Sequence, residues 1–355
     1  MTWPQTRVAQ LLGARLPIVQ AGMAGGITPP ALVAAVSAAG AFGTIGAGTL
    51  SPDRLREAIV EIRARTDRPF GVNLLFPPAR AHGAGAADAV NAVLAPFREE
   101  AGVAEAPRPQ AMPAGLVEAQ LQVAIDERVA MVTFAFGLPP AGAIDALHAA
   151  GAAVFGTVNT VVEALAVVAA GVDAVVAQGA EAGGHRAGLD SEALVGLIAL
   201  VPAIADAVDV PVVAAGGIMD GRGIAAALAL GADGVQLGTA FLLAHESTAP
   251  EAYKAALAGA PEDASITTRA FTGRRARALP TPMIEALEAS GAALLPYPQQ
   301  ASLTAPIRER GIEADRAELL FLLGGQGTRL ARRVSVAELV RALDQETRAT
   351  LARVG

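Results

Sequence analysis

A glycine-rich loop that carries a glutamate and a histidine is the most informative segment of the chain. It reads Gln178-Gly179-Ala180-Glu181-Ala182-Gly183-Gly184-His185-Arg186 and follows an apolar run typical of a buried strand. Glycines such as Gly183 and Gly184 allow positive φ and let the backbone approach a flat ligand closely. Histidine is the natural general base near neutral pH, and only four occur here. The loop predicts a ligand site with His185 as its catalytic residue; the alternative is a surface loop with an incidental histidine.

Two further glycine turns accompany the last two predicted strands. Gly216 and Gly217 end the seventh strand, and Gly238 and Thr239 lie in the eighth. Backbone N–H groups at the start of a following helix can bind an anion without a lysine, which suits a chain whose only lysine is Lys254. In α/β barrels the loops after strands seven and eight often bind phosphate. We expect a phosphate site here, with tight turn packing as the alternative.

Two weaker signals lie at the first and third predicted strands. The first reads Gln20-Ala21-Gly22-Met23-Ala24, and the second reads Gly71-Val72-Asn73-Leu74. The backbone of Ala21, Gly22 and Met23 and the amide of Asn73 are expected to face a heterocyclic ligand. For Asn73, an ordinary polar residue at the end of a strand is the alternative.

Regular alternation of strand and helix patterns explains how these loops would be brought together. The predicted strands, which are short and rich in β-branched residues, are 17–22, 42–47, 70–76, 130–137, 153–158, 174–179, 210–217 and 234–242. The clearest predicted helices are 52–66, 116–128, 191–208, 220–230 and 334–353. An Ala-rich helix, a glycine cap and a strand recur at 38–43, 149–155, 169–175 and 230–235. This pattern predicts an α/β fold, a (β/α)₈ TIM barrel; a doubly wound open sheet is the alternative.

Two long stretches interrupt the alternation. Residues 77–115 follow the third strand and residues 248–333 follow the eighth, and both are rich in proline. Segments after barrel strands emerge at the catalytic, C-terminal face, where long insertions often cover the substrate. We expect a barrel domain made of 1–247 and 334–355, with 248–333 as a substrate-covering insertion.

Composition excludes several other classes of protein. The net charge of −7 and aromatic content of 4% argue against a nucleic-acid-binding surface. The chain has no cysteine, so thiolate metal sites and cysteine nucleophiles are excluded, and no metal site is predicted. No signal-peptide pattern is present, and the uncharged run 31–50 is too rich in glycine for a membrane helix. We expect a cytoplasmic protein without a membrane partner.

Arginines provide almost all of the positive charge. They gather at Arg269, Arg274, Arg275 and Arg277 and again near residues 329–333. We interpret them as surface residues or contacts to an anion.

Taken together, these segments resemble the nitronate monooxygenase family across nearly the whole chain. The resemblance covers 17–23, 71–73, 177–185, 211–218 and 236–241, and it continues in Leu295-Pro296-Tyr297-Pro298 and Gly324-Gly325-Gln326-Gly327. The Glu-Ala-Gly-Gly-His run is its most specific part. Just after this tyrosine, family members tend to carry further polar or aromatic residues, and this chain departs from them with Gln299-Gln300-Ala301-Ser302. The resemblance therefore leaves the native substrate open.

The resemblance implies FMN bound in a TIM barrel. Its phosphate would lie on Gly216, Gly217, Gly238 and Thr239. Asn73, Gln178 and Gln326 would contact the flavin or its ribityl chain. His185 would face the flavin from the substrate side, and Tyr297 would line the substrate pocket.

The resulting hypothesis is oxidation of alkyl nitronates, and of nitroalkanes after proton removal, by O₂ to a carbonyl compound and nitrite. The alternatives are an NAD(P)H-dependent FMN reductase of the same superfamily, acting on quinones or enoyl thioesters, and an inactive flavin- or phosphate-binding module. An IMP-dehydrogenase-like barrel is disfavoured because it needs a cysteine nucleophile. The oligomeric state stays open, with a homodimer among the options.

Overall fold

The computed structural model describes residues 3–189 and 192–354. Eight parallel strands form its central sheet in the order β1-β9-β8-β6-β5-β4-β3-β2. They are β1 (Ile18–Gln20), β2 (Gly43–Gly46), β3 (Phe70–Leu75), β4 (Met131–Ala135), β5 (Ala153–Val158), β6 (Ala174–Gln178), β8 (Val212–Ala215) and β9 (Gly234–Leu237). A parallel bridge between Val19 and Phe42 joins the two outer strands and closes the sheet. The predicted TIM barrel is confirmed, and the open sheet is wrong.

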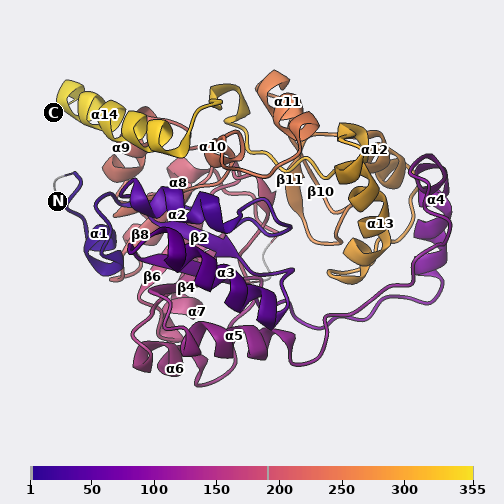
Figure 1. Cartoon of the computed structure of the whole chain (residues 1–355), viewed down its shortest axis with the longest axis horizontal. Helices are drawn as coiled ribbons and strands as arrows, with labels where there is room; N and C mark the ends of the chain where they lie inside the picture. Colours follow the sequence, from indigo (N-terminus) through magenta and orange to yellow (C-terminus); the bar gives the residue numbers. More distant parts are fainter. Residues whose placement is uncertain (1–2, 190–191, 355) are drawn as a thin grey trace.

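Helices surround the barrel strands and separate them in sequence (Figure 1). They are α1 (Arg7–Leu12), α2 (Pro30–Ala38), α3 (Pro52–Arg65), α4 (Ala86–Glu100), α5 (Leu116–Asp126), α6 (Ala143–Ala149), α7 (Val161–Ala169), α8 (Leu197–Ala205), α9 (Gly221–Ala229), α10 (Thr239–Leu242), α11 (Glu251–Gly259), α12 (Pro282–Ala289), α13 (Gln299–Glu313) and α14 (Val336–Val354), with short 3₁₀ turns at Ala317–Leu319 and Thr328–Leu330. Within the described ranges, none of these helices is both long and apolar enough to cross a membrane.

The predicted glycine caps have the expected backbone geometry. Gly40, Gly151, Gly171 and Gly231 each follow a helix and have φ between +86° and +102°. An L-residue adopts this left-handed conformation with difficulty, so glycine is the residue that lets the chain turn there. These caps direct α2, α6, α7 and α9 into the strands that follow them.

Two predicted elements differ most from the structure in their bounds. The eighth predicted strand, 234–242, ends at Leu237, and α10 occupies its second half. Ala240, Phe241 and Leu242 are all buried, and a short apolar run that is buried on every side has no period to separate strand from helix. The predicted helix 191–208 is shortened to α8, and its first residue, Ser191, lies outside the described residues.

Two hydrophobic clusters fill the barrel and the space around it. The barrel interior contains Val19, Phe42, Phe155 and Val213, and α1 adds Val8 and Leu12 to the same cluster. The larger cluster lies between the strands and the surrounding helices and includes Leu32, Ile59, Val201, Ile224 and Leu339. These two packed clusters therefore hold the strands and helices that carry the candidate site residues in place.

A separate hydrophobic cluster holds the two insertions together. It joins Val90 and Leu94 of α4 to Met283 of α12 and Leu303 of α13. Figure 1 shows these three helices side by side, on the opposite side of the molecule from both chain ends. The insertions after the third and eighth barrel strands thus pack on each other. The covering unit that we propose therefore contains α4 as well as 248–333.

A small sheet connects this unit to the histidine loop. Strands β10 (Ile266–Thr268), β11 (Ala276–Ala278) and β7 (Gly184–His185) pair antiparallel in that order. In the β11–β7 pair, Ala276 lies opposite His185, and Arg277 lies opposite Gly184. The histidine is therefore part of a strand that is shared with the insertion.

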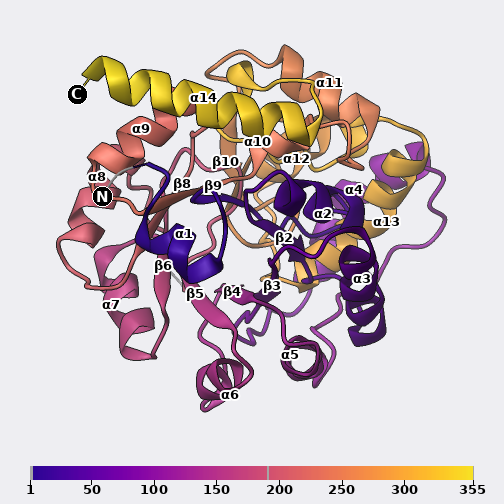
Figure 2. The ribbon, with the colours of Figure 1, turned by 60° about the vertical axis from the view of Figure 1, so that its left-hand side comes forward.

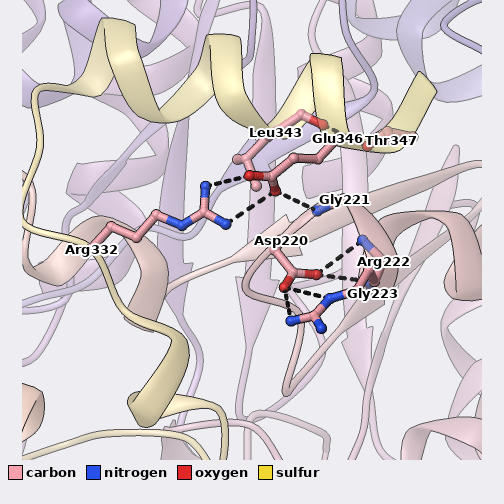
Figure 3. Close-up of polar contacts among 8 residues, drawn as sticks. All are labelled: Asp220, Gly221, Arg222, Gly223, Arg332, Leu343, Glu346 and Thr347. Atoms are coloured by element: carbon pink, nitrogen blue, oxygen red, sulfur yellow. Dashed lines mark hydrogen bonds and ion pairs between the residues drawn. The ribbon is translucent and has the colours of Figure 1, made fainter. Parts of the chain in front are cut away.

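The C-terminal helix α14 lies along α9 (Figure 2). Figure 3 shows the polar contacts at this junction. Glu346 accepts hydrogen bonds from the Gly221 N–H at 3.2 Å and from the Arg332 guanidinium at 2.6 and 3.1 Å. Asp220 caps α9 by accepting from the N–H groups of Arg222 and Gly223. The helix that completes the barrel is thus held at the start of α9.

Replacing Gly221 with alanine should destabilise this junction. A Cβ on Gly221 would lie 2.2 Å from the backbone nitrogen of Thr347, so the backbone of α9 or α14 must shift. We expect a loss of roughly 1–3 kcal/mol, seen as a fall of a few degrees in Tm. Gly223→Ala is the matched control in the same helix, because its Cβ would meet the Ile218 Cγ2 methyl at 3.3 Å. Equal Tm values for both variants would contradict the prediction.

Candidate active site

The late glycine turns and the histidine loop line one pocket at the carboxyl ends of the strands. Gly216 and Gly217 directly follow β8 and have φ of +124° and +68°. Gly238 and Thr239 directly follow β9. The pocket is lined by Ala21, Gln178, Ala182, Gly183, Ala215, Gly216, Gly217, Ile218, Met219, Gln236, Leu237, Gly238, Thr239, Gly325 and Gly327. Residues predicted from strand one, from the histidine loop and from both turns thus meet at one site.

The glycines of this pocket are closely surrounded by backbone. A Cβ on Gly216 would lie 3.0 Å from the Ala182 nitrogen, and one on Gly183 would lie 2.4 Å from the Gly325 nitrogen. Side chains are thereby excluded from these wall positions. Bare backbone with accessible N–H groups is the kind of surface that binds a phosphate closely.

Gln326 is placed differently from the other predicted residues. Its side chain is exposed, while the neighbouring Gly325 and Gly327 line the pocket. The backbone fixes this segment, because the Gln326 N–H donates to the Glu181 carbonyl at 3.0 Å and the Gly325 N–H donates to Thr239 Oγ1 at 3.1 Å. The glycine run in the sequence indicates the segment, but it carries no signal for the direction of the glutamine side chain.

The residues predicted near strand one lie in and beside the pocket. Ala21 lines it. Gly22 packs under Asn73, since a Cβ on Gly22 would lie 2.7 Å from the Asn73 Cβ. The Asn73 amide donates to the Thr133 carbonyl at 3.4 Å, and Met23 Sδ lies 3.8 Å from the position of a Cβ on Gly238. Gly22, Met23 and Asn73 therefore border the same region of the barrel mouth.

Gln178 holds the histidine loop in place. Its Oε1 accepts from Asn159 Nδ2 and from the Ala187 N–H, both at 2.9 Å. Its Nε2 donates to the His185 carbonyl at 2.9 Å. The Gln178 amide, which the sequence predicts to contact a ligand, thus fixes the backbone on either side of Arg186, and sequence reasoning missed this role.

Three aromatic rings surround the His185 imidazole. The ring centroids of Phe136, Tyr297 and Phe321 lie 5.4, 6.0 and 6.0 Å from that of His185, all edge-to-face. Phe136 and Tyr297 also meet edge-to-face at 5.3 Å. The structure therefore brings the predicted His185 and Tyr297 together, although 112 positions separate them in the sequence (297 − 185). Phe136 and Phe321 were not predicted.

Thr272 and two arginines set the electrostatics of the imidazole. Thr272 Oγ1 lies 2.8 Å from His185 Nε2 and donates to the Arg274 carbonyl at 3.3 Å. Enclosure by protein, together with the positive charges of Arg274 and Arg308, lowers the pKa of His185 to about 3. His185 is therefore neutral at physiological pH, with its lone pair available.

Both arginines come from the insertion after β9. The Arg274 guanidinium lies 4.1 Å from the centre of the Phe136 ring and donates to the carbonyls of Arg186 and Gly188. Arg308 on α13 is largely buried, which lowers its pKa. Its Nε has no hydrogen-bond partner among the described residues. Burial raises the pKa of Tyr297, and the charges of the two arginines oppose that shift.

The arginine cluster near residue 274 divides between surface and interior. Arg269 and Arg275 pair with Glu192 at 2.6 and 2.5 Å, as expected for surface residues. Arg277 is buried and donates to the Ala180 carbonyl at 2.9 Å. Spacing indicated the cluster, but only tertiary packing shows that Arg274 reaches the histidine. No group of three or more His, Asp or Glu side chains within 3–189 and 192–354 is arranged to hold a metal ion.

Arg186 completes the support of the loop from inside. Its side chain is fully buried and donates to the carbonyls of Gly179 at 2.6 Å and Gln178 at 2.9 Å. Burial lowers its pKa to about 10, so it stays charged at neutral pH. Hydrogen bonds from the side chains of Gln178 and Arg186 therefore hold the backbone of the loop that carries His185.

Comparisons with known proteins give a consistent result over the length of the chain. A family model described as nitronate monooxygenase matches residues 6–346. A protein of Staphylococcus aureus (strain Newman) named "Probable nitronate monooxygenase" is 40% identical over 333 residues, which is 93% of each chain. Among solved structures, nitroalkane oxidase from Streptomyces ansochromogenes aligns with a TM-score of 0.91 at 41% identity, covering 98% of this chain and 99% of that one. FabK from Thermotoga maritima aligns with a TM-score of 0.78 at 33% identity, covering 99% and 98%.

Proposed function

Because this chain belongs to the nitronate monooxygenase family and is an oxidoreductase, we propose that it uses FMN and O₂ to convert alkyl nitronates to a carbonyl compound and nitrite. The family is flavin-dependent. The observation that carries the proposal is the position of His185, neutral and enclosed by aromatic rings, beside a pocket of bare backbone. Nitroalkanes would enter the same reaction after loss of their α-proton.

We propose that this pocket binds a flavin mononucleotide. Gly216, Gly217, Gly238 and Thr239 would receive the phosphate with backbone N–H groups at the turns after β8 and β9. Gly183, Gly184, Gln178 and the backbone of strand one would border the ring and the ribityl chain. When bound, the flavin supplies the redox chemistry, accepting an electron from the substrate and reacting with O₂.

We propose Nδ1 as the proton acceptor on His185, because Nε2 is engaged by Thr272 Oγ1 at 2.8 Å. The Thr272 hydroxyl also lies 3.3 Å from the Arg274 carbonyl, so it can donate there and accept from an N–H at Nε2. In that tautomer Nδ1 carries the lone pair and takes the α-proton of a neutral nitroalkane. The positive charges of Arg274 and Arg308 favour the anion that forms. That anion in turn raises the proton affinity of the imidazole beside it.

Tyr297 is proposed to contact the substrate within the covering unit. Its ring meets both His185 and Phe136, and its segment belongs to the insertion 248–333. Replacing Tyr297 with phenylalanine keeps the ring and removes a hydrogen bond to an anionic oxygen. We expect kcat/KM for the best nitronate to fall roughly 10- to 150-fold, with FMN content unchanged. Unchanged kcat/KM at unchanged Tm would leave Tyr297 only a packing role.

Rapid mixing without oxygen, followed by an assay in air, tests the proposed function. Bleaching of the flavin by a nitronate and release of nitrite in air are the expected results. Bleaching by NADH or NADPH in place of the nitronate would overturn the proposal in favour of a reductase. Bleaching by none of these compounds would favour a binding module.

A further inference from the structure

A second cleft opens at the barrel mouth, away from the glycine pocket. It has a volume of about 690 Å³ and lies at the carboxyl ends of β3 and β4, beside the start of α5. Phe76 and Leu138 follow these two strands and line it, and Val117 lines it from α5. In the barrel order, β5 and β6 separate these strands from β8 and β9. The cleft and the glycine pocket are therefore distinct.

The walls of this cleft are mainly hydrocarbon. Proline, phenylalanine, leucine, valine and methionine side chains make up most of them. Among the described residues, the charged members of the lining are Arg80 and Glu118, and both residues are exposed. Clefts of about 300–1,000 Å³ with apolar walls are the size that encloses small organic ligands. The chemistry of the cleft suits an uncharged, apolar group.

Phe136 connects the cleft to the candidate active site. It lines the cleft, and its ring also meets the rings of His185 and Tyr297 at 5.4 and 5.3 Å. Its φ of +78° is strained for an aromatic residue. A hydrogen bond from its N–H to the Ala187 carbonyl at 2.9 Å and the Arg274 guanidinium over its ring accompany this conformation. Strained conformations of this kind are concentrated at functional sites.

We propose that this cleft binds the hydrocarbon tail of the substrate, with the nitronate group at His185 and Phe136 between the two. This inference rests on the proposed function and adds a substrate class, linear alkyl nitronates with long chains. Phe136 favours this occupant, because it lines the cleft and its ring also contacts the rings of His185 and Tyr297. An alkyl chain that extends from the reacting carbon of the substrate would thus be transferred from water to a site with apolar walls, which is favourable.

A chain-length series tests the tail site in the flavin-loaded enzyme. The nitronates of nitroethane, nitropropane, nitrohexane and nitrooctane are compared in kcat/KM. Their Kd values are compared by calorimetry without oxygen on enzyme whose flavin has been reduced beforehand, so that no electron transfer accompanies binding. We expect both quantities to improve roughly two- to fourfold for each added methylene that is buried. A flat series in both measurements would overturn the inference.

Leu138→Glu is the variant for this test, because it places a carboxylate on the cleft wall. The Leu138 side chain is already 44% exposed, so the fold should tolerate the change. Leu165→Glu is the matched control, since Leu165 is 50% exposed on α7 and is not part of the cleft lining. Leu138→Glu should abolish the gain for the long nitronates and leave the ethyl compound unchanged, whereas Leu165→Glu should behave as wild type. A gain that survives in Leu138→Glu would overturn the tail site.

The two measurements separate this inference from the proposed function. If no nitronate is turned over but Kd still improves with chain length and loses that trend in Leu138→Glu, the function fails and the tail site stands. If short and long nitronates are oxidised and bound equally well, the function stands and the tail site fails.

Discussion

Replacing His185 with asparagine should reduce kcat/KM for neutral nitroalkanes about 10²–10⁴-fold, the usual cost of removing a general base. Preformed nitronates should lose far less activity, because they have no α-proton to remove. Because the pKa of His185 is about 3, the comparison tests the loss of a base alone. The imidazole is neutral at assay pH, so exchanging it for a neutral amide removes a base without removing a charge.

Paired assays on nitroethane and its nitronate, at equal flavin content and Tm, measure the difference. Wild-type enzyme gives a second check, because the pKa of His185 lies well below its ordinary value of 6.5. Acidification through the range where histidine usually titrates should leave the imidazole unprotonated. Equal losses on both substrate forms in His185→Asn would rule out the base role and leave a role in binding.

Replacing Gly217 with leucine should abolish retention of FMN. The residue follows β8 at a φ of +68°, and a Cβ there would lie 3.2 Å from the Glu181 Cβ, in the wall of the glycine pocket. A branched side chain at this position would occupy the approach of the phosphate. The ratio of flavin to protein absorbance after purification measures the effect, and chromatography of the released cofactor should identify FMN rather than FAD.

Gly102 provides a control that separates backbone strain from pocket blocking. It has the same φ of +68°, and a Cβ there would meet nothing within 4 Å. Gly102→Leu therefore imposes a similar conformational strain and should purify with flavin. A yellow Gly217→Leu protein, or equal flavin loss in both variants, would contradict a phosphate site at Gly217.

The parts of the site that could be predicted from the sequence depend on local signals. Gly216 and Gly217 directly follow β8, and the loop that leads to His185 begins at the end of β6. The carboxyl ends of parallel strands meet at one face of a barrel. The parts that were missed depend on contacts between distant segments. Thr272 lies beside His185, and Arg274 acts on it, because their segment leads into β11, which pairs with β7. The charge of Arg308, which also acts on His185, comes from α13, far along the chain. The spacing of residues in the sequence carries no information about such contacts between distant segments.

Phe136 shows a different limit. In the sequence it is one more apolar residue at the end of a strand, because positive φ is normally signalled by glycine or asparagine and not by phenylalanine. Its conformation comes from the surrounding structure, which includes the bond to the Ala187 carbonyl and the guanidinium of Arg274. A residue that violates its own local preference can be located only once its neighbours are known.

The pairing of β7 with β11 has a consequence for building chimaeric enzymes. An engineer who exchanged 248–333 for the corresponding region of a relative would also replace the strand that positions Gly184 and His185. The grafted segment would have to reproduce the register of Ala276 opposite His185, or the imidazole would be displaced together with its new cover. With the roles proposed for 248–333 and His185, substrate preference and proton transfer depend on the same paired strands, and we expect a productive graft to need the loop 178–188 from the same donor.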